Sequence, residues 1–547
     1  MQAVSRFLLG RPQNLRRASR FAELTRLDVE HFQNVLDATS GSTNRRGANK
    51  EDVANRGSSV VLASDFGSGR TTSSSSSSSS SAKHGSAVEL DRYNRDWLGT
   101  VEGHSQCVLR PRTTEQISAI LKHCHDRGLA VCPQGGNTGL VGGSVPVFDE
   151  IVLSLERMNG IVDIDERSGV AVFEAGCVLE QANSALEKKG LLFPLDLGAK
   201  GSCQIGGNLA TNAGGLRLLR YGNLHGNCLG LEFVKADGSV VDVLSRNKKD
   251  NTGIDLKQLL IGSEGTLGII TKAAFQCPVL PGDTNVLLCA VRTYEDCVKL
   301  FQKARQELGE ILSAFEFFDG RSVACTRDNL QLVPPEFLTA ADSSSSDSGT
   351  STTPSRFAVL IETSGGNGEH DSAKLEGLLE SSSAVILDGT VAASGTQQRS
   401  FWQLRERIAE GLLKDGYTYK YDVSVPDISD IYKIVEAADK RLQSKPISRI
   451  VGYGHMGDGN LHLNVTSPTF DQEIQDTIEP WLWSEVSKYG GSVSAEHGIG
   501  LMKVRAVQYS KSEEALNLMK VVKNTMDPKG ILNPYKVLDG DWPQEEG

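Results

Sequence analysis

The pattern of apolar and polar positions becomes regular from Tyr93 onward. Short strands are predicted at Val108-Leu109-Arg110 and Leu129-Ala-Val-Cys132, where apolar residues run together. Between them apolar residues recur at helical spacing, and Thr113 stands at the position of a helix N-cap. Gly128 is predicted to end that helix, because glycine readily adopts the left-handed conformation found after helix C-termini. The segment therefore predicts a β-α-β unit.

A second pattern surrounds Gly452–Asn464, a stretch with four glycines and two histidines. Ile450-Val451 leads into it as a strand, and Leu461, Leu463 and Val465 later alternate with His462 and Asn464. Residues two apart in a strand share a face, so His462 and Asn464 should point away from a core that holds the apolar residues. The glycine spacing also matches the dinucleotide fingerprint, which requires a helix at its third glycine. We reject that interpretation because an alternating strand follows instead.

The first twenty residues differ in composition from the rest of the chain. Residues 1–20 contain five arginines, and the first acidic residue is Glu23. This composition is typical of a mitochondrial transit peptide, so we expect a protein of the mitochondrial matrix. Removal of residues 1–20 would change the formal charge from −11 to −16 (−11 − 5).

Two serine-rich segments interrupt the regular pattern. Residues 39–88 include nine consecutive serines, and residues 341–355 are rich in Ser, Thr and Asp. Such segments cannot bury enough apolar surface to offset the entropy that ordering would cost. We therefore predict disorder in both, the second being a surface loop inside a domain. One helix is predicted in residues 21–38.

The overall composition is that of a folded protein with large cores. A chain of 547 residues with 39% hydrophobic residues is long enough for two or three domains. It contains no run of 18 apolar residues, which excludes a transmembrane helix. It also lacks basic clusters interleaved with aromatic residues, which argues against nucleic-acid binding. Its ten cysteines form no CxxC pair and have mostly apolar neighbours, so we expect buried, reduced thiols.

Three glycine-rich loops lie in the first half of the regular region. They are Pro133–Ser144, the pair Pro194–Gly198 and Gly206–Gly215, and Ile261–Ile270. Glycine allows backbone N–H groups to turn inward and approach a ligand closely, and such groups cradle phosphate. Three loops of this kind predict a long, phosphate-bearing ligand that lies along several backbone segments.

Three histidines and one carboxylate predict a divalent-metal site with a base beside it. His455 and His462 lie in the glycine-rich stretch, and Glu496 and His497 are adjacent further along the chain. Two histidines and one carboxylate leave coordination positions open for a substrate. We predict His455, His462 and Glu496 as metal ligands and His497 as the base. Zinc is the default metal, although manganese or cobalt would fit the same ligands.

The three glycine-rich loops together resemble the FAD-binding domain of the vanillyl-alcohol-oxidase/PCMH flavoprotein superfamily. Within that superfamily the chain resembles the D-2-hydroxyglutarate dehydrogenase family. The resemblance extends through most of the chain from Tyr93 to Lys536. Besides the loops and the metal stretch, the matching segments are Tyr93–Trp97, Ala199–Ser202, Leu216–Tyr221, Lys249–Gly253, Trp402–Arg407, Tyr419–Asp422 and Asp527–Lys536.

This resemblance implies an α+β fold in three parts. A PCMH-type FAD-binding domain is expected at residues 89–282. A substrate- and metal-binding domain, with an antiparallel sheet and helices, is expected at residues 283–522. Residues 523–547 would form a C-terminal segment that returns to the flavin. The FAD is expected to be non-covalent, and the Pro133–Ser144 loop contains no histidine that would indicate attachment there.

By the same resemblance, most of the expected FAD contacts come from the three loops, and Asn533 is expected to reach the flavin from the C-terminal segment. The residues expected to bind the cofactor are Gly135, Gly136, Asn137, Thr138, Gly139, Gly142, Gly143, Ser144, Pro194, Gly206, Gly207, Asn208, Thr211, Asn212, Gly214, Gly215, Glu264, Gly265, Gly268, Ile269, Ile270 and Asn533.

The resemblance also implies the reaction, which is hydride transfer from a D-2-hydroxy acid to the flavin. Arg405 and Lys420 are expected to contact substrate carboxylates, with Asn464 and His497 binding the substrate beside the metal. Two cations favour a substrate with a second carboxylate, so the first expectation is oxidation of D-2-hydroxyglutarate to 2-oxoglutarate. Ala409 stands where related enzymes carry a hydroxyl side chain, so one substrate hydrogen bond would be missing. Electrons are expected to leave to a separate carrier, electron-transfer flavoprotein.

Three alternatives remain open from the sequence. D-lactate or another D-2-hydroxy acid could be the substrate in the same fold. A metal-dependent hydrolase belongs to a different class, because His/His/Glu sites also activate water. A flavin-binding scaffold without catalytic activity is the third alternative.

Overall fold

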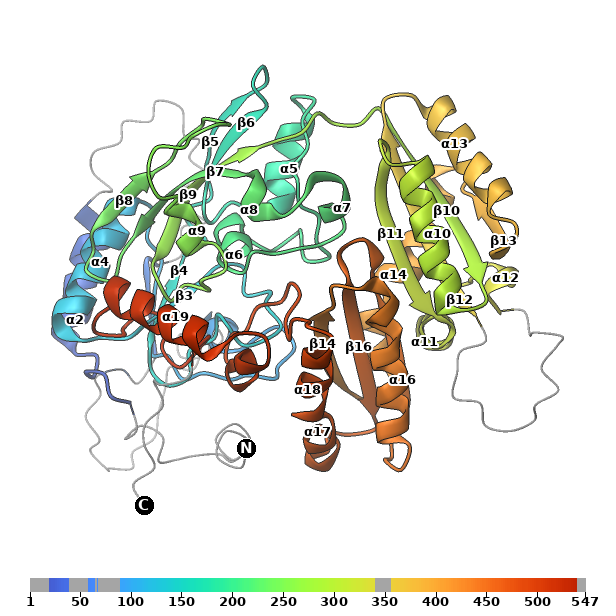
Figure 1. The fold of residues 1–547 in the computed structure, drawn as a ribbon. Helices are drawn as coiled ribbons and strands as arrows, with labels where there is room; N and C mark the ends of the chain where they lie inside the picture. The colour runs from blue at the N-terminus through green and yellow to red at the C-terminus, as the bar shows by residue number, and fades with distance from the viewer. Residues whose placement is uncertain (1–18, 39–57, 64–65, 67–88, 340–355, 539–547) are drawn as a thin grey trace, which may run out of the picture.

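The structure is a computed structural model that describes residues 19–38, 58–63, 66, 89–339 and 356–538. Nearly all of the predicted transit peptide, most of the segment 39–88 and the loop 341–355 lie outside the described residues. In Figure 1 the blue-to-green part of the chain forms one half of the molecule, and the yellow-to-orange part forms the other. The red C-terminal helix lies against the first half.

The first half contains a sheet of four strands in the order β1-β2-β4-β3. Its strands are β1 (Val60–Leu62), β2 (Cys107–Leu109), β3 (Val131–Gln134) and β4 (Ile151–Ser154). The predicted β-α-β unit is confirmed, because helix α4 (Thr114–Arg127) connects β2 to β3 and both strands run parallel to β4. As expected, Thr113 caps α4 by accepting a hydrogen bond from the Gln116 N–H, and Gly128 ends it at φ 72°.

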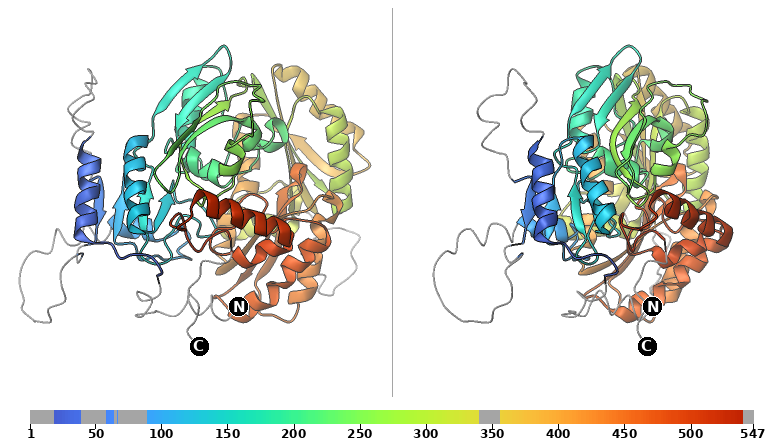
Figure 2. Two further views of the ribbon diagram at one scale, coloured as in Figure 1. Left: turned by 60° about the vertical axis from the view of Figure 1, so that its left-hand side comes forward. Right: turned by 90° about the vertical axis from the view of Figure 1, so that its left-hand side faces the viewer.

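The N-terminal part of the described chain packs on this sheet. Helix α2 (Arg26–Ala38) forms within the predicted helical segment and lies beside α4, in blue in both views of Figure 2. Strand β1 falls in the segment 39–88, so the prediction of disorder is wrong for residues 58–63. The reason is local: Val60-Val61-Leu62 is an apolar, mostly β-branched run that pairs antiparallel with β2.

The same half contains an antiparallel sheet of five strands in the order β5-β6-β9-β7-β8. Its strands are β5 (Ile161–Asp165), β6 (Val170–Glu174), β7 (Cys228–Val234), β8 (Val240–Val243) and β9 (Ile269–Gln276). The helices between them are α5 (Leu179–Glu187), α6 (Ile205–Ala210), α7 (Leu218–Tyr221), α8 (Leu224–Asn227) and α9 (Lys257–Leu260). The segment Gly206–Gly215 is therefore not a loop throughout, since its first part belongs to α6. Gly206 allows that helix to pack closely, because a Cβ there would lie 2.6 Å from the Ala175 Cβ.

The second half is built on one antiparallel sheet of seven strands in the order β13-β10-β12-β11-β15-β16-β14. Its strands are β10 (Asp283–Val291), β11 (Leu312–Asp319), β12 (Phe357–Gly365), β13 (Ile386–Val391), β14 (Tyr417–Ser424), β15 (Arg449–His455) and β16 (Asn460–Ser467). The predicted strand with His462 and Asn464 is β16, and its alternating apolar residues are fully buried. A single 3₁₀ turn, η4 (Met456–Asp458), stands where a dinucleotide fingerprint would need a helix.

Helices cover both faces of the seven-stranded sheet (Figure 1). One face, which carries Phe315, Tyr419 and Leu463, packs against α10 (Tyr294–Glu307), α13 (Gly368–Ser381), α16 (Ile431–Leu442), α17 (Gln472–Ile478) and α18 (Trp481–Lys488). The opposite face packs against α11 (Gly320–Leu330), α12 (Glu336–Thr339), α14 (Gly395–Glu406) and α15 (Ile408–Leu412). Antiparallel sheets and separate helices make the fold α+β, as predicted.

The C-terminal part of the chain returns to the first half. It consists of η5 (Val504–Tyr509), α19 (Glu513–Met526) and an extended segment. Nζ of Lys523 on α19 donates to the Thr266 carbonyl oxygen at 2.8 Å. The Asn533 N–H donates to the Val131 carbonyl oxygen on β3, also at 2.8 Å. The predicted start of the returning segment, residue 523, lies inside α19, which begins at Glu513.

Glycines line the contact between the two halves. A Cβ at Gly214 would lie 3.0 Å from Oε2 of Glu496, and one at Gly457 would lie 2.7 Å from Cδ1 of Leu219. At Gly500 a Cβ would lie 2.4 Å from a backbone oxygen of the first half. Each of these contacts joins one half to the other. Side chains at these positions would therefore push the halves apart.

Candidate active site

One face of the seven-stranded sheet collects the polar side chains that the sequence analysis singled out. Residues directly opposite each other in an antiparallel pair lie on the same face of the sheet. Three such pairs lie on neighbouring strands: Lys420 with Asn464, Asp422 with His462, and Glu316 with His455. The register of β11, β14, β15 and β16 therefore brings together residues that are far apart in the sequence.

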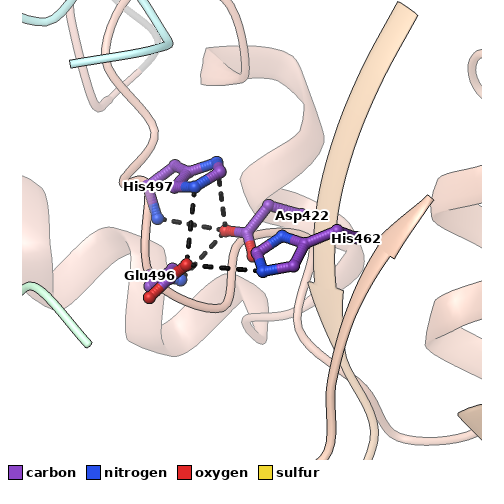
Figure 3. A group of neighbouring side chains, drawn as sticks. All are labelled: Asp422, His462, Glu496 and His497. Carbon is purple, nitrogen blue, oxygen red and sulfur yellow. Dashed lines mark hydrogen bonds and ion pairs between the residues drawn. The ribbon is translucent and has the colours of Figure 1, made fainter. Parts of the chain in front are cut away.

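Three histidines approach one carboxylate oxygen. Oε1 of Glu496 lies 4.0 Å from Nε2 of His455, 3.7 Å from Nε2 of His462 and 3.6 Å from Nε2 of His497. Figure 3 shows the Glu496 carboxylate joined by dashed lines to the rings of His462 and His497. Ligand atoms about 2.0–2.2 Å from a zinc ion stand roughly 3.4 Å apart in a tetrahedral site. The separations from Glu496 are only slightly wider, so a metal ion would fit between this carboxylate and a neighbouring histidine.

Asp422 is a competing ligand for that position. In the described part of the chain, Asp422, His462, Glu496 and His497 form a group whose potential ligand atoms all lie within 4.8 Å of one another, and His455 is not part of this group. However, Oδ2 of Asp422 already accepts hydrogen bonds from the N–H groups of residues 495–497, at 2.9 to 3.1 Å. Oδ1 accepts another from Nδ2 of Asn460 at 2.7 Å. Because both oxygens are engaged, Asp422 fits the role of holding the turn, and the assignment of His455 as the third ligand stays a prediction.

Asp422 was not predicted as a site residue, although strand alternation indicates it. Asp422 lies two residues after Lys420 on β14, so the two side chains share a face. Burial alone would raise the pKa of Asp422, but His497, Lys503 and His462 hold it well below its usual range. The carboxylate is therefore charged at neutral pH.

His455 is fixed by a buried carboxylate that the sequence analysis also missed. Nδ1 of His455 donates to Oε1 of Glu316 at 2.7 Å, and Oε2 of Glu316 lies 2.8 Å from Nη2 of Arg405. Burial alone would lower the pKa of His455, but Glu316 raises it to about 9. Because Nδ1 faces Glu316, Nε2 faces Glu496, and a ring nitrogen in this position can bind a metal only after it loses its proton. The signal in the sequence was a single acid within an apolar strand, Phe315-Glu-Phe-Phe318.

His462 and His497 have opposite pKa shifts. Burial lowers the pKa of His462 to about 3, so its ring is neutral and can bind a metal. Burial alone would also lower the pKa of His497, but Asp422 and Glu496 raise it. Nδ1 of His497 lies 3.7 Å from Oδ2 of Asp422. A histidine between two carboxylates accepts a proton readily, which suits the role predicted for His497.

A cavity of about 690 Å³ adjoins this cluster, and Glu496 and His497 line it together with all three glycine-rich loops. Five residues expected to bind the cofactor are not among those that line the cavity: Gly142, Pro194, Asn212, Gly215 and Asn533. The expected cofactor residues that do line it are Gly135, Gly136, Asn137, Thr138, Gly139, Gly143, Ser144, Gly206, Gly207, Asn208, Thr211, Gly214, Glu264, Gly265, Gly268, Ile269 and Ile270.

The cavity suits a ligand that lies close to the backbone. A Cβ added at Gly139 or Gly207 would meet no protein atom within 4 Å, so the space beside these glycines is open to a cofactor. Gln204 also lines the cavity, and its buried Oε1 has no hydrogen-bond partner among the described residues. Buried polar atoms nearly always have a partner, so Gln204 fits a cofactor contact that the sequence analysis missed.

Two residues expected to bind the cofactor contact other parts of the protein. Nδ2 of Asn533 donates to the carbonyl oxygens of Gly143 and Glu264, at 3.0 and 2.7 Å. Asn533 therefore connects the first and third glycine-rich loops without lining the cavity itself. The Glu264 carboxylate accepts hydrogen bonds from the N–H groups of Ile499 and Gly500, both at 2.7 Å. These contacts connect the loops to the C-terminal segment and to the turn that carries Glu496.

The residues expected to bind the substrate surround the cluster. Nζ of Lys420 lies 5.7 Å from the centre of the Trp97 ring, which lines the cavity. Burial lowers the pKa of Lys420, and no carboxylate in the described part of the chain offsets this effect. Arg405 is buried beside Glu316, yet its Nε and Nη2 make no hydrogen bond of good geometry with described residues. Lys420 and Arg405 can therefore bind a further carboxylate. Asn464 is buried next to Tyr453.

Two family models match the chain. Residues 105–244 match the family described as FAD binding domain, and residues 280–537 match the C-terminal domain of FAD linked oxidases. The first match contains two of the glycine-rich loops, and the second contains the histidines and Glu496. These matches show that FAD is the cofactor.

Solved structures show the same fold. The crystal structure of p-cresol methylhydroxylase with substrate bound has a TM-score of 0.65 and 15% sequence identity, and the match covers 93% of this chain and 96% of that one. At this identity the likeness shows the fold alone. The predicted PCMH-type fold is thereby confirmed.

Curated relatives are much closer in sequence. The mitochondrial D-2-hydroxyglutarate dehydrogenase of Danio rerio is 51% identical over 447 residues, which cover 81% of this chain and 80% of the relative. A mitochondrial protein of Schizosaccharomyces pombe, provisionally named as a D-lactate dehydrogenase, is 49% identical over 82% of this chain and 85% of its own. These names confirm the predicted mitochondrial location. Within the described residues no helix is long and apolar enough to cross a membrane. The chain belongs to the D-2-hydroxyglutarate dehydrogenase family of FAD-dependent oxidoreductases.

Proposed function

We propose that this enzyme oxidises D-2-hydroxyglutarate to 2-oxoglutarate with the help of a divalent metal ion, most simply Zn²⁺. The observation that supports this proposal is that Glu496 and His497 each take part in two features of the site. Both belong to the histidine cluster, and both line the cavity formed by the glycine-rich loops. A hydroxy acid bound at the cluster would therefore lie beside a flavin in the cavity.

His455, His462 and Glu496 would hold the metal ion, and the glycine-rich loops would hold FAD. When bound, the metal acts as a Lewis acid that lowers the pKa of a hydroxyl group, and FAD supplies the hydride acceptor. His497 accepts the hydroxyl proton at Nε2. Asp422, 3.7 Å from Nδ1 of the same ring, stabilises the charged imidazole that results.

Lys420 and Arg405 would bind the carboxylates of the substrate. Lys420 has no carboxylate partner among the described residues. Nη2 of Arg405 pairs with Glu316, but neither Nε nor Nη2 makes a hydrogen bond of good geometry with described residues. Asn464 lies opposite Lys420 across the strand pair and would donate a hydrogen bond beside them. Two cations suit a dicarboxylate better than D-lactate, which has one carboxylate.

We also propose that electrons leave to a separate carrier, electron-transfer flavoprotein, in the mitochondrial matrix. The sequence contains no haem motif and no Fe–S cysteine spacing. All ten cysteines are buried and unpaired, as expected from their apolar neighbours. The test is whether substrate-reduced enzyme reduces purified electron-transfer flavoprotein, and the absence of this transfer would contradict the proposed carrier.

A substrate panel on the purified flavin-loaded protein tests the substrate. With an artificial dye as electron acceptor, we expect a higher kcat/KM for D-2-hydroxyglutarate than for D-lactate. The Lys420→Met variant, which keeps the apolar stem and removes the charge, should lose most of this preference. D-lactate is the second candidate, because the S. pombe relative bears that name. A clear preference of the unmodified enzyme for D-lactate would decide for the second candidate.

Metal dependence is tested on the same preparation. Treatment with a chelator should abolish turnover without removing flavin absorbance, and Zn²⁺, Mn²⁺ or Co²⁺ should restore it. Elemental analysis before and after treatment identifies the metal that the protein carries. Full turnover in a preparation shown to contain no divalent metal would refute this part of the proposal.

A further inference from the structure

The turn that carries Glu496 and His497 is held between two buried carboxylates from different halves of the molecule. From the second half, Oδ2 of Asp422 accepts the N–H groups of residues 495–497. From the first half, Glu264 accepts the N–H groups of the residues that follow, with Oε1 on Ile499 and Oε2 on Gly500, both at 2.7 Å. Two acceptors on successive N–H groups fix the orientation of a turn as well as its position.

We propose that Glu264 is a positioning residue for the reaction, which sets the place of His497 relative to the flavin, rather than a residue that binds FAD through its side chain. The proposal rests on the proposed roles of Glu496 and His497. Glu264 belongs to the third glycine-rich loop and lines the cofactor cavity, but its carboxylate points across to the other half.

The backbone of Glu264 is held as firmly as its side chain. Its N–H donates to the Ala210 carbonyl oxygen at 2.7 Å, and its own carbonyl oxygen accepts from Nδ2 of Asn533 at 2.7 Å. Its φ of 51° lies in the left-handed region, which is uncommon for residues other than glycine. Strained backbone that the surrounding contacts maintain is frequent where a side chain must be aimed. Here those contacts aim the carboxylate at the turn.

The turn is shaped to receive this carboxylate. Gly498 has a φ of 84° and Gly500 a φ of 50°, so both favour glycine. A Cβ at Gly498 would lie 2.9 Å from the Glu264 carboxyl carbon, which is closer than side chains approach. Ser494 adds a bond within the turn, from its Oγ to the Gly498 carbonyl oxygen at 2.7 Å. The glycines thus allow the contact, and the carboxylate occupies the space that they leave.

One residue therefore connects the loop that holds the flavin to the turn that holds the base. A shift of Glu264 relative to Ile499 and Gly500 would move His497 relative to the cofactor. Because a displacement of about 1 Å can slow a reaction by about a hundredfold, this contact should affect the chemical step more than substrate binding.

The first test is the holoenzyme variant Glu264→Gln, which keeps the shape but places an NH₂ group against a backbone N–H. We expect its flavin content to match that of the unmodified enzyme. Flavin reduction by substrate in a single turnover should be about a hundredfold slower, with a much smaller change in KM than in kcat. The matched control is Glu232→Gln, another buried carboxylate of the first half, bonded to Thr114 and Thr271 away from the site. This control should be reduced at the normal rate.

A second pair of variants perturbs the contact from the other side and serves if Glu264→Gln does not fold. Gly498→Ala should retain flavin and be reduced slowly. Gly253→Ala carries the same backbone strain, at φ 86°, but its Cβ meets no atom within 4 Å, so it should be reduced normally. Loss of flavin in proportion to activity in Glu264→Gln would make Glu264 a cofactor-binding residue. Normal reduction of Glu264→Gln or Gly498→Ala would show that the contact does not position the base. Failure of the unmodified enzyme to be reduced by D-2-hydroxyglutarate would instead refute the proposed function.

Discussion

Replacing Glu316 by glutamine should remove the pH dependence of metal binding and weaken that binding at high pH. Glutamine keeps the shape of the side chain but removes the charge between His455 and Arg405. In the structure Glu316 accepts from Nδ1 of His455 at 2.7 Å and lies 2.8 Å from Nη2 of Arg405. Its influence on metal affinity has two parts with opposite signs.

The first part is the support that the carboxylate gives to the ligand. A carboxylate that accepts the second ring N–H of a metal-bound histidine typically raises metal affinity by about 10- to 100-fold. This corresponds to about 1.4–2.7 kcal/mol. Glu316→Gln should lose most of this contribution at every pH.

The second part is competition with a proton. Because Glu316 raises the pKa of His455 to about 9, the ring is protonated at pH 7 when no metal is bound. A raised pKa means that the protonated form is favoured below about pH 9, so metal binding at pH 7 must first release a proton. Two pH units cost about 2.7 kcal/mol of binding free energy. The variant is largely free of this cost, because the His455 pKa falls when the charge is removed.

The two parts oppose each other at pH 7, and only the first remains at pH 9. The affinity of the unmodified protein should rise about tenfold per pH unit over this range, whereas that of Glu316→Gln should stay almost flat. The variant should therefore bind metal between about equally well and about tenfold more tightly than the unmodified protein at pH 7, and about 10- to 100-fold more weakly at pH 9.

The measurement is a chelator-buffered titration of the metal-stripped, flavin-loaded protein with Zn²⁺ at pH 7, 8 and 9. The matched control is Glu362→Gln, a half-buried carboxylate on the neighbouring strand β12, bonded to Ser313 and Trp402. It should follow the unmodified protein at each pH. A ratio of affinities that is the same at pH 7 and pH 9 would show that Glu316 does not control the protonation of His455.

Three further predictions concern the cofactor cavity, the core and the N-terminal helix. Gly207→Ala places a methyl group in the cavity without touching protein atoms and should lower the flavin content of the purified protein. Gly226→Ala, whose residue does not line the cavity, is the control and should keep the normal flavin content. Equal flavin absorbance of the two variants would contradict this prediction. Leu463→Ala, at a fully buried position, should cost about 2–5 kcal/mol in urea unfolding, against less than about 0.5 kcal/mol for Leu518→Ala on the exposed side of α19. Asp28 is buried, which would raise its pKa, but hydrogen bonds from Arg127, Thr25 and His123 lower it. Its stabilisation is therefore complete above the unfolded pKa of about 3.9 and is lost as the pH falls further. Asp28→Asn should accelerate amide exchange in α2 at pH 7, and a difference of the same size at pH 3 would count against this mechanism.

The strand that carries His462 could be predicted because its pattern is local. Alternation over six residues fixes which side chains share a face, and Leu461, Leu463 and Val465 are indeed buried opposite His462 and Asn464. The partners of that face could not be predicted. Glu316 bonds His455 across 139 residues of sequence, and only the pairing of β11 with β15 brings them together.

The glycine-rich loops were recognisable, but the direction of their side chains was not. Most of the residues expected around the cofactor do line the cavity. The direction of the Glu264 side chain could not be predicted, because a loop residue can turn its side chain toward the ligand or away from it. The choice depends here on a turn more than 230 residues later in the sequence.

Strand β1 could not be predicted either. Its three apolar residues lie in a polar segment and become a strand only by pairing with β2.

The glycine-lined contact between the halves has a consequence for the exchange of parts among relatives. Leu219 and Glu264 belong to the flavin half, and the glycines that accommodate them, Gly457 and Gly498, belong to the other. A chimera that joins the flavin half of one relative to the substrate half of another would therefore combine two surfaces that never fitted each other. Such a hybrid should be active only where the residues on both sides of this contact come from the same relative. Recombination between relatives should therefore preserve the contact between the halves as a unit, and exchanging a whole domain is not enough.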